Sequence, residues 1–184
     1  MAAEALRLAR QRKRQLVIEV FSGAGAISHY LRALGYAVIS IDTCINKELD
    51  VTSSCLLDCL VGWARCGMVL GLWLAPPCTT WSIAHTTPPL RSAEWPMGLP
   101  NLAPAYALKV ASANRVFKAT LRIAKVVIVL CVPCMLENPL TSRMFLASDF
   151  QRIIGHTSPS YVACDMCQFG ARWRTANALH TWQC

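Results

Sequence analysis

Apolar and polar positions along the chain fall into two kinds of segment, short apolar runs and longer stretches with helical spacing. The runs predict strands at residues 16–21, 36–41, 68–74, 126–131 and 161–164. The helical spacing predicts helices at residues 3–14, 24–34, 54–65, 104–124 and 143–153. This alternation predicts an α/β fold with a doubly wound, mostly parallel sheet whose site lies at the ends of the strands.

Two segments of the chain, residues 75–104 and 126–131, stand out from this alternation by their composition. Residues 126–131 form a continuous run of mainly β-branched residues, which is typical of a parallel strand covered on both faces. Residues 75–104 contain seven of the ten prolines and therefore predict a long loop. Loops of that length in compact domains are usually functional.

The ends of the first two predicted strands carry features of a cofactor site. A glycine turn with Gly23 and Gly25 joins the first strand to a helix, in the manner of a nucleotide-binding turn. Asp42 ends the second strand, where a carboxylate can accept both ribose hydroxyls of a nucleoside. A solvated aspartate at the start of a turn is the competing interpretation.

A thiol and a carboxyl group follow two other apolar runs. Cys78 stands in the sequence Ala-Pro-Pro-Cys-Thr-Thr-Trp-Ser, and Glu137 stands in Met-Leu-Glu-Asn-Pro. Both are expected at one edge of the sheet. A nucleophilic cysteine beside a proton-donating carboxyl group is what attack on an electron-poor pyrimidine ring requires.

Charge and composition favour a polyanionic partner. The 184 residues carry a formal net charge of +8, and five cations but no carboxylate lie between residues 95 and 136. We divide the chain into a basic N-terminal helix, residues 1–15, and one domain, residues 16–184. Two solvated helix faces would explain the same cations.

The ten cysteines do not indicate a disulfide framework, because the chain shows no secretory leader and is large and apolar enough to fold without crosslinks. Reduced thiols in the cytoplasm or nucleus are expected. The longest apolar run, residues 126–136, is too short to span a bilayer, so no membrane partner is expected.

Taken in order, these motifs resemble those of the catalytic domain of DNA cytosine-5 methyltransferases, in a divergent, phage-like branch. The series comprises the Phe21–Gly25 turn, Asp42, the Asp-Val-Thr step at Asp50, the Pro-Cys-x-x-x-Ser segment, Glu-Asn, and a Gln-x-Gly-x-Arg-x-Arg variant at residues 168–174. The resemblance implies a Rossmann-like, class I methyltransferase fold. The chain stops about where this family places its target-recognition region, so we expect another chain to supply recognition.

The resemblance also implies a role for each matching residue. Cys78 attacks carbon 6 of cytosine, Glu137 protonates or hydrogen-bonds ring nitrogen 3, and Arg172 and Arg174 hold the base or its flanking phosphate. S-adenosylmethionine is the implied cofactor and DNA the implied substrate. The implied cofactor-pocket residues are Phe21, Gly23, Gly25, Asp42, Asp50 and Pro77, and those of the substrate side and its lid are Ser82, Arg91 and Asn138.

Several alternatives stay open. Cys134 lies where RNA cytosine methyltransferases carry their nucleophile, which keeps RNA as a second substrate. Two Cys-x-x-Cys pairs, at residues 131–134 and 164–167, have the spacing of a zinc site. A structural role is favoured over zinc, because Cys131 ends a predicted buried strand and neither pair has the glycine-rich knuckle that such sites favour. Cys55, Cys59 and Cys66 are expected to pack as small apolar side chains. A non-catalytic, basic nucleic-acid-binding module is the remaining alternative.

Overall fold

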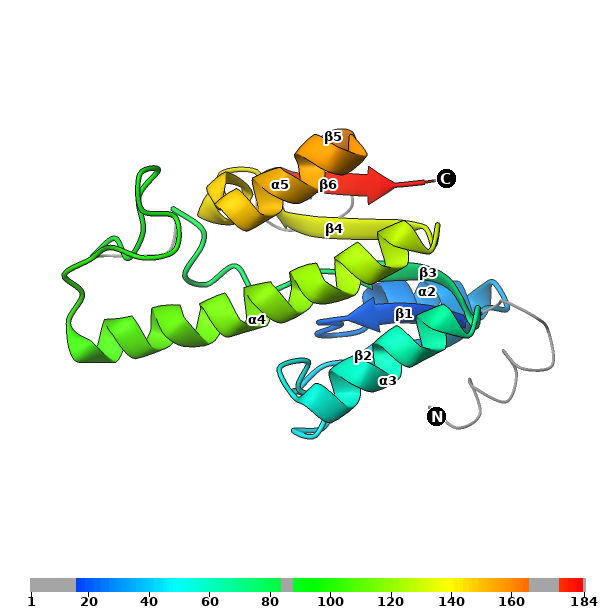
Figure 1. Cartoon of the computed structure of the whole chain (residues 1–184). Coiled ribbons are helices and arrows are strands. Elements are labelled where there is room, and N and C mark those ends of the chain that lie inside the picture. The colour runs from blue at the N-terminus through cyan, green and yellow to red at the C-terminus, as the bar shows by residue number, and fades with distance from the viewer. Residues whose placement is uncertain (1–15, 84–87, 166–175, 184) are drawn as a thin grey trace.

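The computed structural model describes residues 16–83, 88–165 and 176–183 as strands and helices that alternate through most of the chain (Figure 1). The predicted helix at residues 3–14 lies outside this part. The elements in chain order are β1 (Leu16–Val20), α2 (Ala26–Ala33), β2 (Ala37–Ile41), α3 (Ser54–Arg65), β3 (Val69–Leu74), α4 (Pro104–Val129), β4 (Cys134–Pro139), the 3-10 helix η1 (Arg143–Leu146), α5 (Ser148–Thr157), β5 (Ser160–Asp165) and β6 (Ala176–Trp182).

The strands of the described residues form one six-stranded sheet in the order β2-β1-β3-β4-β6-β5. Neighbouring strands from β2 to β4 run parallel, whereas β6 runs antiparallel to both β4 and β5. The predicted α/β class is therefore confirmed, and the sheet is mixed. Its general architecture is Rossmann-like.

The chain reverses its direction of winding at β1. From β1 it moves to β2 on one side, and then returns to β3 on the other side. In open α/β sheets, ligands bind beyond the carboxyl ends of the strands at such a switch point. The segments that leave β1 and β3 flank this point, and the Ala75 amide donates a 3.2 Å hydrogen bond to the Val20 carbonyl there.

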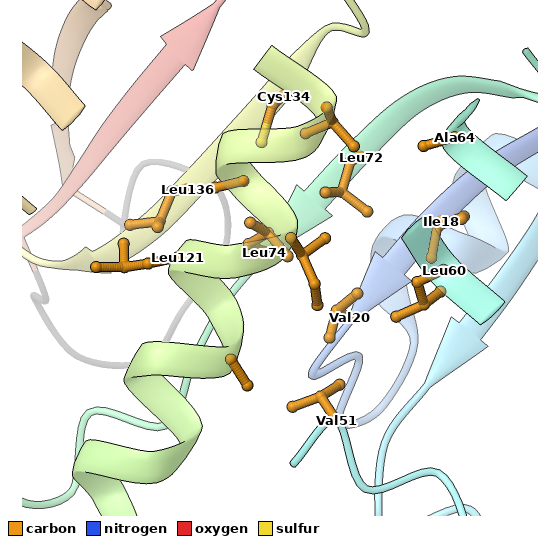
Figure 2. Packing of buried hydrophobic residues seen from close by; sticks show 14 of the residues in the cluster. Ile18, Val20, Val51, Leu60, Ala64, Leu72, Leu74, Leu121, Cys134 and Leu136 are labelled. Carbon is orange, nitrogen blue, oxygen red and sulfur yellow. The ribbon is translucent and has the colours of Figure 1, made fainter. Parts of the chain in front are cut away.

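The main core lies between the sheet and the layer that contains α3 and α4 (Figure 2). Alternate strand residues face this layer, since successive side chains of a strand point to opposite faces. Ile18 and Val20 of β1 meet Leu72 and Leu74 of β3 in this core. Leu136 of β4 belongs to the same core, so its neighbour Glu137 lies on the opposite face of the sheet.

The predicted strand at residues 126–131 is wrong, because these residues form the last turns of α4 and the turn after it. The helix ends with the left-handed Cys131, φ 54°, and with two hydrogen bonds, from the Cys131 amide to the Ile128 carbonyl and from the Val132 amide to the Val127 carbonyl. This is the Schellman pattern. Val127 packs into the core on the helical spacing, so burial is satisfied without a strand.

The remaining predictions are closer to the structure. The predicted helix at residues 54–65 is confirmed with the same bounds, and the predicted elements at residues 16–21, 24–34, 36–41, 68–74 and 104–124 are found within a few residues. The predicted helix at residues 143–153 is two helices, η1 and α5, separated at the extended Ala147. Strand β5 is confirmed near residues 161–164, whereas β4 and β6 were not predicted.

The packing expected for the α3 cysteines is wrong. Cys55, Cys59 and Cys66 are all exposed, because the buried face of α3 is formed by Leu57, Leu60, Val61 and Ala64. In the part of the chain that the structure describes, no helix combines the length and the apolar character needed to cross a membrane.

Candidate active site at the ends of the parallel strands

The turn after β1 has the backbone conformation that a glycine turn permits. Gly23 and Gly25 have φ values of 51° and 71°, and a Cβ atom at either position would meet open space. Phe21 also has a positive φ, 63°, and its amide donates a 2.7 Å hydrogen bond to the carbonyl of Ile41. This non-glycine residue in the left-handed region marks a strained position next to the turn.

Asp42 connects the end of β2 to this turn. Its Oδ2 accepts a 2.9 Å hydrogen bond from the Gly23 amide, and its Oδ1 accepts a 2.8 Å bond from the Cys44 amide. Burial alone would raise the pKa of Asp42, but these amide hydrogen bonds outweigh it and hold the pKa below its ordinary value. Asp42 is therefore a carboxylate at neutral pH.

A cavity of about 340 Å³ lies beside the glycine turn, and its lining includes Gly23, Gly25, His29, Arg32, Ser40 and Ile45. Ligand pockets commonly measure roughly 300–1,000 Å³. Of the other predicted cofactor residues, Phe21 packs on the core, and Asp50 caps the turn before α3 by accepting 2.8 Å bonds from the Thr52 amide and hydroxyl. Neither they nor Pro77 and Asp42 are among the residues that line this cavity, although Asp42 binds the amide of Gly23, which does.

A buried polar network that the sequence did not predict lies beneath the turn. Glu19 of β1 accepts hydrogen bonds from the amide and the hydroxyl of Ser28, near the start of α2. Ser28 in turn accepts a 2.6 Å bond from Ser40, whose hydroxyl accepts one from Arg32. The network fixes the amino end of α2. Its only signal in the sequence is a glutamate within an apolar strand.

Asn138 joins the two segments that carry the predicted catalytic groups. Its side-chain amide donates a buried 2.7 Å hydrogen bond to the carbonyl of Pro76, two residues before Cys78. Asn138 is almost completely buried on β4, immediately after Glu137. Asn138 was predicted on the substrate side, and in the structure its side chain holds the Cys78 segment against β4.

The charge of the Glu137 carboxyl group acts on the Cys78 thiol. Burial raises the pKa of Cys78, and the negative charge of Glu137 raises it further, against a hydrogen bond within Cys78 that lowers it. Burial also raises the pKa of Glu137. The environment therefore favours a protonated carboxyl group and a neutral thiol, and two negative charges are disfavoured at this place.

The start of the proline-rich loop is a compact turn. The Trp81 and Ser82 amides each donate a 2.9 Å hydrogen bond to the Cys78 carbonyl. Ser82 is buried, and it lines a cavity of about 160 Å³ together with Arg91 and Arg143. The Arg91 guanidinium, which was predicted on the substrate side or its lid, is held within the loop by protein acceptors.

Some predicted groups lie outside the described residues or in unfavourable positions. Arg172, Arg174 and Cys167 lie outside the described part of the chain. Cys134 is buried at the start of β4, where burial raises its pKa to about 12, so its thiol is poorly suited to nucleophilic attack. Among the described residues, no group of three or more His, Cys, Asp or Glu side chains has the arrangement of a metal site.

Comparison with known proteins adds no assignment. No protein-family model matches the chain, and a search of curated proteins finds no match.

Proposed function

We propose that this chain transfers a methyl group from S-adenosylmethionine to carbon 5 of cytosine in DNA. The observation that carries the proposal is the hydrogen bond from Asn138 to the Pro76 carbonyl, because it joins the segment of Cys78 to the strand of Glu137. A thiol, and a carboxyl group whose charge acts on the pKa of that thiol, thereby lie toward the carboxyl ends of neighbouring parallel strands.

The two side chains have complementary tasks in this reaction. The Cys78 thiolate forms a bond to ring carbon 6, and Glu137 donates its proton to ring nitrogen 3, which accepts the displaced electron pair. The ring then reacts through carbon 5 with the methyl group. Loss of the carbon 5 proton, expulsion of the Cys78 thiolate and return of the nitrogen 3 proton to Glu137 restore the neutral aromatic ring. A raised pKa suits Glu137 to this work, because it keeps the proton available.

The residues around the glycine turn fit the nucleoside part of the proposed cofactor. An ionised carboxylate has about four lone-pair sites, and the amides of Gly23 and Cys44 and the Cys44 thiol use three of those of Asp42. The remaining site, or the one released when the Cys44 thiol turns away, could accept a ribose hydroxyl. The neighbouring cavity of about 340 Å³ has room for such a group. When bound, the cofactor supplies an electrophilic methyl group.

The first half of α4 and the loop before it form an arm that extends beyond the sheet (Figure 1). Helix α4 has 26 residues, which corresponds to a length of about 39 Å. Lys109, Arg115 and Lys118, here called the arm cations, are exposed along it. We propose that they contact the phosphates of DNA, and that the target base leaves the duplex to reach Cys78.

Trapping with a modified base tests the proposal. A DNA oligonucleotide containing 5-fluorocytosine, incubated with the chain and S-adenosylmethionine, should form a covalent adduct, because fluorine blocks release of the base. Peptide mapping should find the adduct at Cys78, and Cys78→Ser should abolish it.

Matched oligonucleotides of DNA and RNA distinguish the substrates in this assay. An adduct on Cys134 with RNA would overturn the Cys78 assignment. Absence of any adduct, together with no heat of S-adenosylmethionine binding, would favour the non-catalytic nucleic-acid-binding module.

A further inference from the structure

Arg91 is a buried cation that connects three segments around Cys78. Its side chain is only 6% exposed. The guanidinium donates to the Thr80 carbonyl (3.0 Å), the Thr80 hydroxyl (2.9 Å), the Pro96 carbonyl (2.8 Å) and Asn114 Oδ1 (2.9 Å). These acceptors belong to the turn that begins at Cys78, to the far part of the loop, and to α4.

The same guanidinium lies over the ring of Trp81, with its carbon atom 3.5 Å from the ring centroid. Trp81 is buried and also contacts Phe117 of α4, at 5.0 Å between ring centroids. The Trp81 amide donates to the Cys78 carbonyl. A displacement of Trp81 would therefore be passed directly to the backbone of Cys78.

The partners of Arg91 are all neutral groups. Burial lowers the pKa of Arg91 to about 10, so the side chain is still charged at neutral pH. Burying a cation without a carboxylate is costly, and a fully apolar contact would often be at least as stable. The guanidinium can, however, donate five hydrogen bonds in a fixed plane, and here it reaches acceptors on three segments at once.

We infer that Arg91 is a positioning residue that holds the Cys78 turn against α4 and so fixes the place of the Cys78 thiol. The catalytic consequence of this inference rests on the proposed function, whereas its structural consequence rests on the contacts of Arg91 alone. Asn114 supports the same arrangement, since its side-chain amide donates a 2.8 Å hydrogen bond to the Met97 carbonyl.

The test measures the accessibility and acidity of Cys78 without relying on methyl transfer. The full chain is treated with iodoacetamide at several pH values, and mass spectrometry of peptides gives the alkylation rate of each cysteine. In Arg91→Ala, Cys78 should react faster by up to about tenfold, the change that one pKa unit makes in the thiolate fraction. The buried Cys134 should keep its slow rate, which reports that the sheet is intact.

Two further variants separate geometry from charge and from general destabilisation. Arg91→Lys keeps the positive charge but cannot donate in one plane to three segments, so it should behave like Arg91→Ala. Arg65→Ala removes an exposed arginine at the end of α3 and should leave the rate at Cys78 unchanged. A wild-type rate in Arg91→Lys or Arg91→Ala, or equal acceleration of Cys78 and Cys134, would overturn the inference.

A second measurement connects positioning to catalysis. With 5-fluorocytosine DNA, Arg91→Ala should form the Cys78 adduct about 10²-fold more slowly, as expected for a misplaced nucleophile, while its affinity for S-adenosylmethionine is unchanged. An unchanged adduct rate, or lost cofactor affinity, would contradict the positioning role. If the wild type forms no adduct, the proposed function fails, but the alkylation rates still decide whether Arg91 holds the turn.

Discussion

Removing the side-chain amide of Asn138 tests how firmly the Cys78 segment is joined to β4. Asn138 is 1% exposed and donates the 2.7 Å hydrogen bond to the Pro76 carbonyl. Asn138→Ala leaves that carbonyl without its donor and opens a small space under the turn. The two prolines that precede Cys78 stiffen the segment, so we expect it to move as a unit.

The expected cost follows from the burial of this bond. A buried polar group that loses its partner costs about 1–3 kcal/mol. The Asn138 Oδ1 is itself buried without a partner among the described residues, and its removal offsets part of the loss. We therefore expect the free energy of unfolding to fall by an amount near the lower end of that range. The effect on adduct formation should be larger, about 10²-fold, because the nucleophile is displaced.

Urea unfolding and the rate of adduct formation with 5-fluorocytosine DNA measure the two effects separately. Thr157→Val is the matched control, because it removes the acceptor of a 2.7 Å hydrogen bond from Trp182 at the opposite end of β4. The control should lose a similar free energy of unfolding and keep its adduct rate. Equal rate losses in both variants would refute the reasoning, because the loss would then follow from stability alone.

Three further predictions concern Glu137, the end of α4 and the arm. Burial raises the pKa of Glu137 above 4.5, so the folded chain holds the carboxyl proton of Glu137 more tightly than the unfolded chain does. The contribution of Glu137 to the free energy of unfolding should therefore be complete below pH 4.5 and be lost as the pH rises through the pKa of the folded state. Urea unfolding at several pH values should show this loss in the wild type and not in Glu137→Gln, and identical pH profiles would contradict it. Cys131→Gly should raise the free energy of unfolding by about 1 kcal/mol, because glycine adopts the left-handed conformation of this position without strain. Cys131→Ala should not raise it, and equal free energies of unfolding for the two variants would contradict the strain argument. Replacing the arm cations with glutamate should weaken DNA binding equally for all sequences. The slope of the logarithm of the binding constant against the logarithm of the salt concentration should become shallower by about 0.9 for each lost phosphate contact. An equal effect of Arg152→Glu on α5 would show that only the net charge matters.

The positions of the glycine turn after β1 and of Cys78 after β3 could be predicted from sequence, because the carboxyl ends of parallel strands meet at one edge of a sheet. Glu137, by contrast, lies within β4, and the strand before it was predicted at residues 126–131. The pattern fails where the signal is missing or misleading. Helix α4 continues through a β-branched run, and its left-handed end residue is Cys131 where a glycine would mark the stop. Strand β6 buries Asn177 and His180, so it lacks the apolar alternation that predicts a strand.

The contacts that hold the site together could not be predicted, because they join residues far apart in the chain. Asn138 and Pro76 are 62 positions apart, and Arg91 and Asn114 are 23 apart. A polar residue in an apolar strand or in a proline-rich loop shows that it needs a partner, but not which one. This is why the sequence placed Asn138 and Arg91 on the substrate side or its lid without indicating the protein groups that they bind.

The coupling between Cys78 and Glu137 indicates which kind of substrate would activate the thiol. The charge of Glu137 raises the pKa of Cys78, so a proton held on Glu137 makes the thiol easier to ionise. A ring nitrogen that accepts a hydrogen bond from the protonated carboxyl group stabilises that form. Binding of such a ring should therefore promote formation of the thiolate, and a ring without an acceptor at that position should leave it neutral. An electron-poor pyrimidine with an unprotonated ring nitrogen meets this requirement, and cytosine is such a base.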